Sequence, residues 1–338
     1  MRIGFNPSKN KEVAEHDFFH QVIIPVYIPN FEGYFKDSFQ IFKYSIESLF
    51  KTSHHQTYFT IINNGSCREV TDYLDQLYKE AKIQELMHTT AIGKLNAILK
   101  GVTGHNFPLV TITDADVLFL NNWQQSTYDV FETFPKAGVV STTPNSKMVR
   151  YLTSGILFDN LFSKQLFFTD VKNPKALSAF AHSIGKPDLF NVEHLKKILT
   201  LSKGEQKAVV GAGHFVATYK GSVFDNWTTR FSVHSLGGKS INNLLDKPIA
   251  EKGYWRLSTQ DNFTYHMGNV PEDWMISELN DLVVCNQKVN LPNLVNHKEN
   301  YISAYVKVKL FSKVIFNKFV WKWFIAGKGL TKVQAEKY

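Results

Sequence analysis

Short apolar runs and helical apolar patterns follow one another along the first third of the chain. Three runs rich in Val, Ile, Phe and Thr predict buried strands, at 22–27, 57–62 and 107–113. Between them, apolar residues recur at helical spacing at 37–50, 70–86 and 91–99. Because strands that alternate with helices form parallel βαβ units, this pattern predicts an α/β fold with a mainly parallel sheet.

The pattern is less regular in the second half of the chain. Residues 137–142 predict a further strand, and 192–199 have helical character. Residues 207–219 predict two strands on either side of a glycine turn. A dinucleotide-binding loop is rejected there, because β-branched residues follow the glycines instead of a helix and the third glycine of that fingerprint is missing.

Polar residues stand at the ends of three predicted strands, at 27–30, 63–66 and 114–116. In open α/β sheets, ligands bind beyond the carboxyl ends of the parallel strands. The topology therefore predicts that these three segments converge on one crevice.

Asp114 and Asp116 end the most apolar of these runs, with one residue between them. Two carboxylates held close together raise each other's pKa unless a cation lies between them. Mg²⁺ or Mn²⁺ suits such oxygen ligands and leaves coordination positions for substrate phosphates. The alternative is a pair of solvated aspartates in a turn, which is common for an isolated Asp-x-Asp. The strand context favours a metal–diphosphate site.

Composition limits the class of protein. The chain has 338 residues, of which 43% are hydrophobic, so we expect one large or two modest domains with a sizeable core. The two cysteines, Cys67 and Cys285, fit no metal or redox spacing and predict free thiols in a reducing compartment. The first 21 residues contain no apolar signal-peptide core, and no uncharged apolar run is long enough to span a bilayer.

The positive charge is concentrated at the C-terminus. Residues 294–338 contain nine lysines and two glutamates, a net charge of +7 out of +8 for the whole chain. The rest of the chain is near neutral, which argues against a nucleic-acid-binding body. Lysines mixed with Trp and Phe at 305–326 suit a helix that lies on an anionic membrane surface. The alternative is a C-terminal helix packed on the body, with its lysines reaching solvent.

Six segments, in this order, resemble the GT-A-type glycosyltransferases, specifically the family 2 group. They lie at 22–27, 63–66, 93–97, 113–116, 211–215 and 260–269. The resemblance implies a Rossmann-like, mixed and mainly parallel sheet flanked by helices. It implies a GT-A domain at 1–293, with a nucleotide-binding half at about 20–120 and an acceptor half at about 121–293. The basic, aromatic and helical tail at 294–338 would be an extension of this domain.

The resemblance also implies donor-binding roles. Pro25, Val26 and Tyr27 would line the nucleotide base pocket. Asn63 stands where the family usually has an aspartate, a departure that leaves the identity of the base open. The remaining donor residues would be Lys94, near the phosphates, Asp114, near the ribose, Ala115, and Asp116, the metal ligand.

The later motifs imply the remaining roles. Asp261 would be the catalytic base, although it could also cap a helix, and Asp273 is a rival carboxylate. His266 would complete the metal shell formed by Asp116 and Asp114, or be an ordinary hydrogen-bonded residue. The sugar or acceptor would contact Gly211, Gly213, His214 and Trp255, although the glycines could simply form a tight turn and the tryptophan could belong to the core.

The implied activity is an inverting, single-displacement transfer from a nucleotide sugar, with a UDP-sugar as the expected donor and with Mn²⁺ or Mg²⁺. The acceptor would be a glycan or a lipid-linked hydroxyl in cell-surface polysaccharide synthesis. The expected location is the cytoplasm, with peripheral contact to the inner face of the membrane. The main alternative is a catalytically inactive carbohydrate-binding or scaffold protein with the same fold. A sugar nucleotidyltransferase ranks lower, because no Gly-rich, basic phosphate loop follows the first strand.

Overall fold

A computed structural model describes residues 3–12, 16–225, 227, 231–237, 239–286, 288–297 and 299–338. Its centre is a ten-stranded sheet in the order β3-β2-β1-β4-β10-β6-β11-β9-β8-β7. The strands are β1 (His20–Val26), β2 (Thr57–Asn64), β3 (Glu85–Thr89), β4 (Leu109–Thr113), β6 (Ala137–Ser141), β7 (Leu166–Asp170), β8 (Lys197–Lys203), β9 (Gln206–Val210), β10 (Val216–Lys220) and β11 (Trp255–Thr259). A second, two-stranded sheet pairs β5 (Val117–Phe119) with β12 (Thr264–His266).

The predicted fold class is confirmed. The pairings place seven strands in one direction, with β10, β9 and β7 reversed. The order β3-β2-β1-β4 is that of a nucleotide-binding half of a doubly wound sheet. The antiparallel strand β10 then lies between β4 and β6, so the sheet is mixed.

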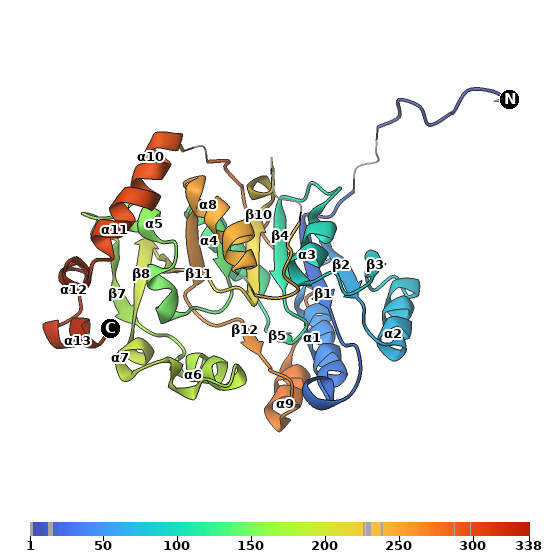
Figure 1. Cartoon of the computed structure of the whole chain (residues 1–338), viewed down its shortest axis with the longest axis horizontal. Coiled ribbons are helices and arrows are strands. Elements are labelled where there is room, and N and C mark those ends of the chain that lie inside the picture. The colour runs from blue at the N-terminus through green and yellow to red at the C-terminus, as the bar shows by residue number, and fades with distance from the viewer. Residues whose placement is uncertain are drawn as a thin grey trace.

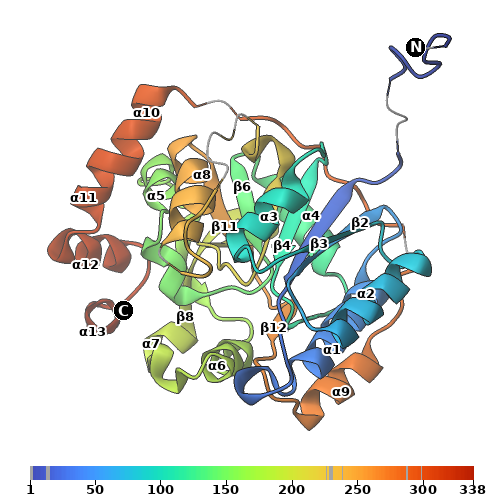
Figure 2. The same cartoon turned by 45° about the vertical axis from the view of Figure 1, so that its right-hand side comes forward.

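Helices flank the sheet (Figure 1). In the first 200 residues they are α1 (Ser38–Thr52), α2 (Arg68–Lys79), α3 (Lys94–Val102), α4 (Trp123–Thr133), α5 (Ser154–Asp159), α6 (Pro174–Ser183) and α7 (Val192–Lys196). Later come α8 (Lys247–Glu251) and α9 (Asp273–Asp281), which lies beside α1 (Figure 2). The C-terminal helices are α10 (Tyr301–Tyr305), the π-helical η6 (Val306–Phe311), α11 (Ser312–Ile315), α12 (Lys318–Gly327) and α13 (Lys332–Lys337). None of the described helices is long and apolar enough to cross a membrane.

The alternation of side chains along β1 explains why both faces of the sheet are covered. Val22, Ile24 and Val26 are fully buried and belong to a core shared with residues of α1 and α2. Ile23 points the other way and belongs to a core shared with α3. Successive residues of a strand face opposite sides, so a continuous apolar run such as this one requires a helix layer on each side.

Two predicted helices are shorter in the structure. The helix predicted at 70–86 ends at Lys79, because Ala81 adopts a left-handed φ of 55°. The chain then forms the edge strand β3, with Ile83 buried. The helix predicted at 192–199 ends at Lys196, where β8 begins and pairs with β7 and β9. Tertiary pairing overrides the local pattern in both places.

The two strands predicted at 207–219 are confirmed as β9 and β10, but they do not form a hairpin. In the sheet, β6 and β11 lie between them. The glycine segment therefore begins beside Arg256, near the amino end of β11, and ends where β10 begins opposite Thr113, at the carboxyl end of β4.

The C-terminal helices pack on the body at the β7–β8 end of the sheet (Figure 1). Trp321, Phe324 and Ile325 of α12 belong to the same core as Leu199 and Leu201 of β8. The backbone N–H of Phe168 in β7 also donates a 2.8 Å hydrogen bond to the carbonyl of Lys328. The tail thus shares a hydrophobic core with the sheet.

Candidate active site

A cavity of about 440 Å³ opens where β1, β2 and β4 end. Residues from all three strand ends line it, so the structure brings the three polar segments together. Among the lining residues are Pro25, Tyr27, Ile28, Asn64, Gly93, Lys94, Asp114, Ala115, Asp116, Ser235 and Asn269. This is the crevice expected from the order of strands and helices.

Asp114 and Asp116 lie directly after β4, on the floor of this cavity. The backbone N–H of Asp114 donates a 2.8 Å hydrogen bond to the carbonyl of Phe215, next to β10. The Asp114 carboxylate forms an ion pair with Lys94, the first residue of α3. Gly93 precedes that lysine with φ of 93°, and a Cβ there would lie 2.9 Å from the Cα of Ser235. A side chain at this position would therefore displace the segment that covers Lys94.

The small sheet β5–β12 places His266 close to Asp116. His266 pairs with Val117 in that sheet, and the backbone N–H of Met267 donates a 2.8 Å hydrogen bond to the carbonyl of Asp116. These contacts place His266 Nε2 3.5 Å from Asp116 Oδ2, while His266 Nδ1 lies 3.0 Å from Ser183 Oγ. Burial raises the pKa of the Asp116 carboxyl, and the Asp114 charge adds to this, while His266 and Lys94 oppose it.

The Asp116–His266 pair fits a divalent metal ion. Asp116 Oδ1 is buried and has no hydrogen-bond partner among the described residues, which is costly for a carboxylate oxygen. No group of three or more His, Cys, Asp and Glu side chains in the described ranges could hold a metal alone. Two protein ligands with oxygens supplied by a diphosphate and water are an ordinary arrangement for Mg²⁺, and Mn²⁺ accepts the same ligand types.

The residues predicted for the base pocket are divided between two environments. Pro25 and Tyr27 line the cavity, and Tyr27 is 45% exposed. Val26 is fully buried in the core between them, because neighbouring strand residues face opposite sides. Asn63 is also turned away from the cavity. Its side chain donates to Thr71 Oγ1 at 2.9 Å, lies 3.0 Å from His88 Nδ1, and accepts from the N–H of Ser66.

The residue after Asn63 takes the cavity position instead. Asn64 lines the cavity, and its Oδ1 accepts a 3.0 Å hydrogen bond from the backbone N–H of Ile92. Tyr34 also lines the cavity and was missed at the sequence level. Burial raises the pKa of its phenol, and the charges of Asp116 and Asp114 add to the effect. Only its position in the segment after the first strand could have suggested it.

The glycine segment, residues 211–213, contacts a buried ion pair that no sequence motif predicted. Asp246, in the π-helical η5 (Asn242–Asp246), pairs with Arg256 of β11, and both side chains are fully buried. Arg256 Nη2 donates a 2.9 Å hydrogen bond to the carbonyl of Ala212, between Gly211 and Gly213.

The two glycines have different surroundings. Gly211 has φ of 108°, and a Cβ there would lie 2.7 Å from the Met148 carbonyl oxygen, so this position requires glycine. Gly213 has more space, with only Ser141 Oγ within 4 Å of an added Cβ. Neither glycine lines the cavity.

His214 lies beside the buried ion pair, with its side chain 33% exposed. Its Nδ1 is 3.0 Å from Asp246 Oδ2. The Tyr151 hydroxyl donates to the same oxygen at 3.0 Å and accepts from Asn242. Burial lowers the pKa of His214, and the charges of Arg256 and Lys94 lower it further, while Asp246 and Asp114 raise it.

The predicted base, Asp261, lies outside the cavity lining and is exposed. Its Oδ1 accepts a 2.8 Å hydrogen bond from the backbone N–H of Asn262, and its carbonyl accepts from Thr259 Oγ1. These contacts stabilise the turn after β11. Its role as base stays a prediction. Its rival, Asp273, is the first residue of α9 and also lies outside the cavity lining.

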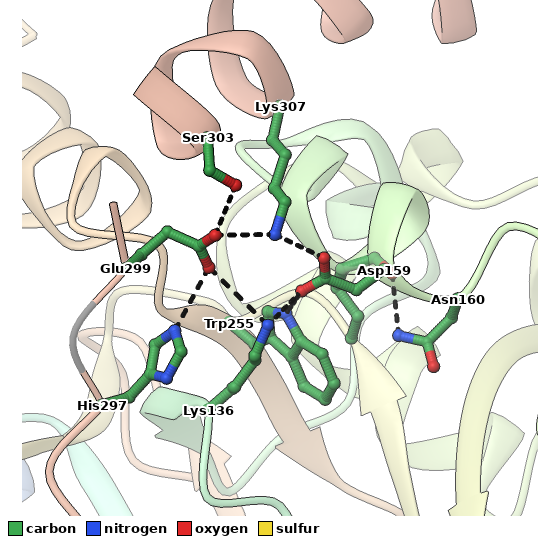
Figure 3. A network of polar contacts seen from close by, with 9 residues as sticks. Lys136, Asp159, Asn160, Trp255, His297, Glu299, Ser303 and Lys307 are labelled. Atoms are coloured by element: carbon green, nitrogen blue, oxygen red, sulfur yellow. Dashed lines mark hydrogen bonds and ion pairs between the residues drawn. The ribbon is translucent and has the colours of Figure 1, made fainter. Parts of the chain in front are cut away.

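Trp255 does not line the cavity. It is the first residue of β11, and β11 runs parallel to β6, so Trp255 lies at the amino edge of the parallel strands. Its Nε1 donates a 3.0 Å hydrogen bond to Asp159 Oδ2 (Figure 3). In the structure Trp255 therefore packs and donates a hydrogen bond at this edge, and its role in sugar binding stays a prediction.

Figure 3 shows the network around Trp255, which joins the body to the tail. Lys307 contacts Asp159 Oδ1 at 2.6 Å and Glu299 Oε1 at 2.9 Å. Lys136 contacts Asp159 Oδ2 at 2.8 Å and Glu299 Oε2 at 3.6 Å. Burial alone would raise the pKa of Glu299, but hydrogen bonds from Ser303, Lys307 and His297 outweigh it and lower the pKa to about 2.

No protein-family model matches the chain, and no characterised protein sequence matches it. Among solved structures, it is similar to the mannosyltransferase PcManGT from Pyrobaculum calidifontis, in complex with GDP-Man and Mn²⁺. That likeness has a TM-score of 0.45 at 13% identity, over 97% of this chain and 77% of the other. It is also similar to S. aureus TarS 1–349 in complex with UDP-GlcNAc, with a TM-score of 0.41 at 12% identity, over 95% and 70% of the two chains.

A third similar structure is GalNAc-T7 with UDP, GalNAc and Mn²⁺. Here the TM-score is 0.46 at 11% identity, over 74% of this chain and 44% of the other. All three are glycosyltransferases, the class that the sequence motifs resemble. At these identities and TM-scores the likeness is distant, and membership of family 2 stays a prediction.

Proposed function

We propose that the chain is a metal-dependent glycosyltransferase that uses a nucleotide-sugar donor. The observation that carries this proposal is the Asp116 carboxylate, which has one oxygen unpartnered and the other 3.5 Å from His266, at the carboxyl ends of the parallel strands. A diphosphate with its metal ion would complete this incomplete ligand set. The nearby cation, Lys94, supports binding of an anionic donor.

The donor would lie along the cavity from β1 to β4. Tyr27 and Tyr34 are exposed aromatic side chains that could stack on a nucleobase, and Asn64 offers an amide at the end of β2. Asp114, paired with Lys94 and lining the same cavity as Asp116, would contact the ribose or the diphosphate. A UDP-sugar is the proposed donor, as the sequence resemblance implies.

The proposed reaction is a single displacement with inversion. The acceptor hydroxyl oxygen forms a bond to the anomeric carbon, and the bond from that carbon to the diphosphate oxygen breaks with its electron pair. A bound Mn²⁺ or Mg²⁺ would offset the negative charge that develops on the leaving diphosphate. Lys94 would stabilise the same charge, and the cavity residues would hold the donor so that most of the rate comes from positioning.

A release assay tests this function. The full chain is incubated with UDP-, GDP- and CMP-sugars in Mn²⁺, Mg²⁺ or EDTA, and free nucleotide is measured. We expect metal-dependent release from one class of donor, the UDP-sugars. Binding of nucleotide without any release, across all donors, would instead support the carbohydrate-binding or scaffold alternative. Release that is equal in EDTA would contradict the metal-dependent reaction.

We also propose that the tail holds the enzyme at an anionic membrane surface, where lipid-linked acceptors are found. Phe319 and Trp323 lie four residues apart on α12 and are 80% and 77% exposed, whereas Trp321, Phe324 and Ile325 of the same helix are buried. Lys318 and Lys322 lie beside the two exposed aromatic residues in the sequence. Aromatic side chains with adjacent lysines suit the interface of an anionic bilayer.

Co-sedimentation with phosphatidylglycerol-containing vesicles tests this surface. The double variant Phe319→Ser, Trp323→Ser should lose most of the bound fraction, while nucleotide release in solution stays unchanged. Tyr301→Ser is a matched control, because Tyr301 is also an exposed tail aromatic, in α10. Equal sedimentation of the double variant and the unaltered chain would rule out this surface.

A further inference from the structure

His214 is positioned by a buried acid that the proposed donor site does not use. Its Nδ1 lies 3.0 Å from Asp246 Oδ2, and the Asp246 carboxylate is fully buried. Arg256 and the Tyr151 hydroxyl hold that carboxylate from two other directions. A carboxylate held by Arg256 and Tyr151 has little freedom to turn, so it presents a fixed negative charge to the imidazole next to it.

The position of His214 relative to the cavity follows from the strand register. In the β10–β4 pair, Val216 is opposite Thr113, and the carbonyl of Phe215 accepts the hydrogen bond from the N–H of Asp114. His214 is the next residue along, beside the chain that carries Ala115 and Asp116 into the cavity floor. The charges of Lys94 and Asp114, both cavity residues, also act on its imidazole.

The two ring nitrogens of His214 have different surroundings. His214 Nδ1 lies 3.0 Å from Asp246 Oδ2 but makes no hydrogen bond with the described residues, so the contact is electrostatic. With the proton on Nδ1, next to that carboxylate, Nε2 carries a lone pair. The side chain is one-third exposed and lies outside the lining of the donor cavity, so a bound acceptor, and not the donor, would contact it. Burial lowers the pKa of His214, as do Arg256 and Lys94, against Asp246 and Asp114, so the neutral imidazole is favoured.

We propose that His214, oriented by Asp246, accepts the proton of the acceptor hydroxyl in the transfer reaction. This inference rests on the proposed glycosyltransferase function. As the hydroxyl oxygen bonds to the anomeric carbon, its proton moves to His214 Nε2, and the resulting imidazolium faces the Asp246 carboxylate. The proton then leaves to solvent. His214 is the catalytic residue in this proposal, whereas Asp246, Arg256 and Tyr151 are positioning residues.

The test compares turnover with donor binding. With the donor found by the release assay, His214→Gln should lower kcat by about 10²-fold or more, the usual contribution of a general base. The Kd of the matching nucleoside diphosphate with Mn²⁺, measured by calorimetry, should change by less than about threefold. The kcat of the unaltered enzyme should fall at acidic pH as the histidine is protonated, and this dependence should be absent in His214→Gln. His55→Gln, at an exposed position, is the control and should change neither quantity.

A second variant tests the orienting group without removing its charge. Tyr151→Phe deletes one hydrogen bond to Asp246 and leaves the Asp246–Arg256 pair intact. It should lower kcat by a smaller factor than His214→Gln and leave the Kd unchanged. A melting temperature close to that of the unaltered chain shows that the fold is retained.

The outcomes separate the two proposals. If the unaltered chain releases nucleotide and His214→Gln keeps its kcat, the role of His214 is wrong and the glycosyltransferase function stands. If His214→Gln loses nucleotide binding together with kcat, His214 is a donor-binding residue and not the base. If no donor is turned over by the unaltered chain, the proposed function fails and the role of His214 fails with it.

Discussion

Two clusters of charged side chains lie at opposite edges of the same parallel strands, and they differ in how completely they are paired. At the amino edge, Asp159 and Glu299 are matched by Lys136 and Lys307, two negative charges against two positive ones (Figure 3). At the carboxyl edge, Asp116 keeps an unpartnered buried oxygen. Because burying an unpaired charge is costly, the incomplete cluster supports the proposed donor site, and the complete one supports a role in folding.

Asp116→Asn should give the largest effect and would sharpen this comparison. Loss of the ligand charge should lower nucleotide release on the order of 10³-fold, because the charge of the leaving diphosphate is no longer offset. The melting temperature should stay the same or rise, because the ionised Asp116 has a raised pKa and therefore costs stability above that pKa. Release and thermal unfolding are measured on the same preparations.

Asp170→Asn is the matched control, since that side chain is 86% exposed and lies in β7, away from the cavity. Its release rate should equal that of the unaltered chain. A large drop in melting temperature for Asp116→Asn, with release retained, would place Asp116 among the structural charges and remove the contrast between the clusters.

Lys307→Met should give the opposite result: loss of stability with activity retained. The variant leaves Lys136 as the remaining lysine in contact with Asp159 and Glu299, beside His297 on Glu299, and the Lys307 side chain is 9% exposed. Removing one partner of such a buried pair should lower the free energy of unfolding by about 3 kcal/mol. Urea unfolding measures this loss, and nucleotide release per folded molecule should not change.

Lys313→Met tests whether the loss is specific to the network. Lys313 is exposed and lies in the same tail, in α11. Its removal should change the free energy of unfolding by less than about 0.5 kcal/mol. If both variants are equally stable, the network contributes little and the tail is held by its apolar contacts alone.

The acid stability of the protein should depend on Glu299. Its pKa in the folded chain is about 2, below its ordinary value of 4.5, because hydrogen bonds from Ser303, Lys307 and His297 outweigh burial. The unfolded chain therefore takes up this proton first, and the stabilisation is lost as the pH falls from about 4.5 to about 2. Urea midpoints measured across this range should fall less steeply for Glu299→Gln than for the unaltered chain.

Asp261→Asn should give the smallest effect, less than about tenfold in kcat, because Asp261 is exposed and caps its own turn. A loss of 10²-fold or more, with His214→Gln active, would return the role of base to Asp261. Release assays on the two variants side by side decide between them.

The sequence predicted the location of the candidate site where the strand pattern was regular. The end of β4 could be predicted from the apolar run before Asp114, and the order of strands and helices predicted that Tyr27 and Asp116 share one cavity. The pattern did not predict which individual residues of a strand end face the cavity. Val26 and Asn63 lie one residue from cavity-lining positions, because a shift of one residue reverses the face of a strand.

What the residues alone determined is the alternation of strands and helices, and with it the edge of the sheet where polar residues gather. Each of those features depends on the spacing of neighbours along the chain. Only the tertiary structure decided that Trp255 packs against the tail network and that Asp246 reaches His214. Those contacts depend on the order of strands across the sheet and on the packing of distant segments, which local periodicity does not encode.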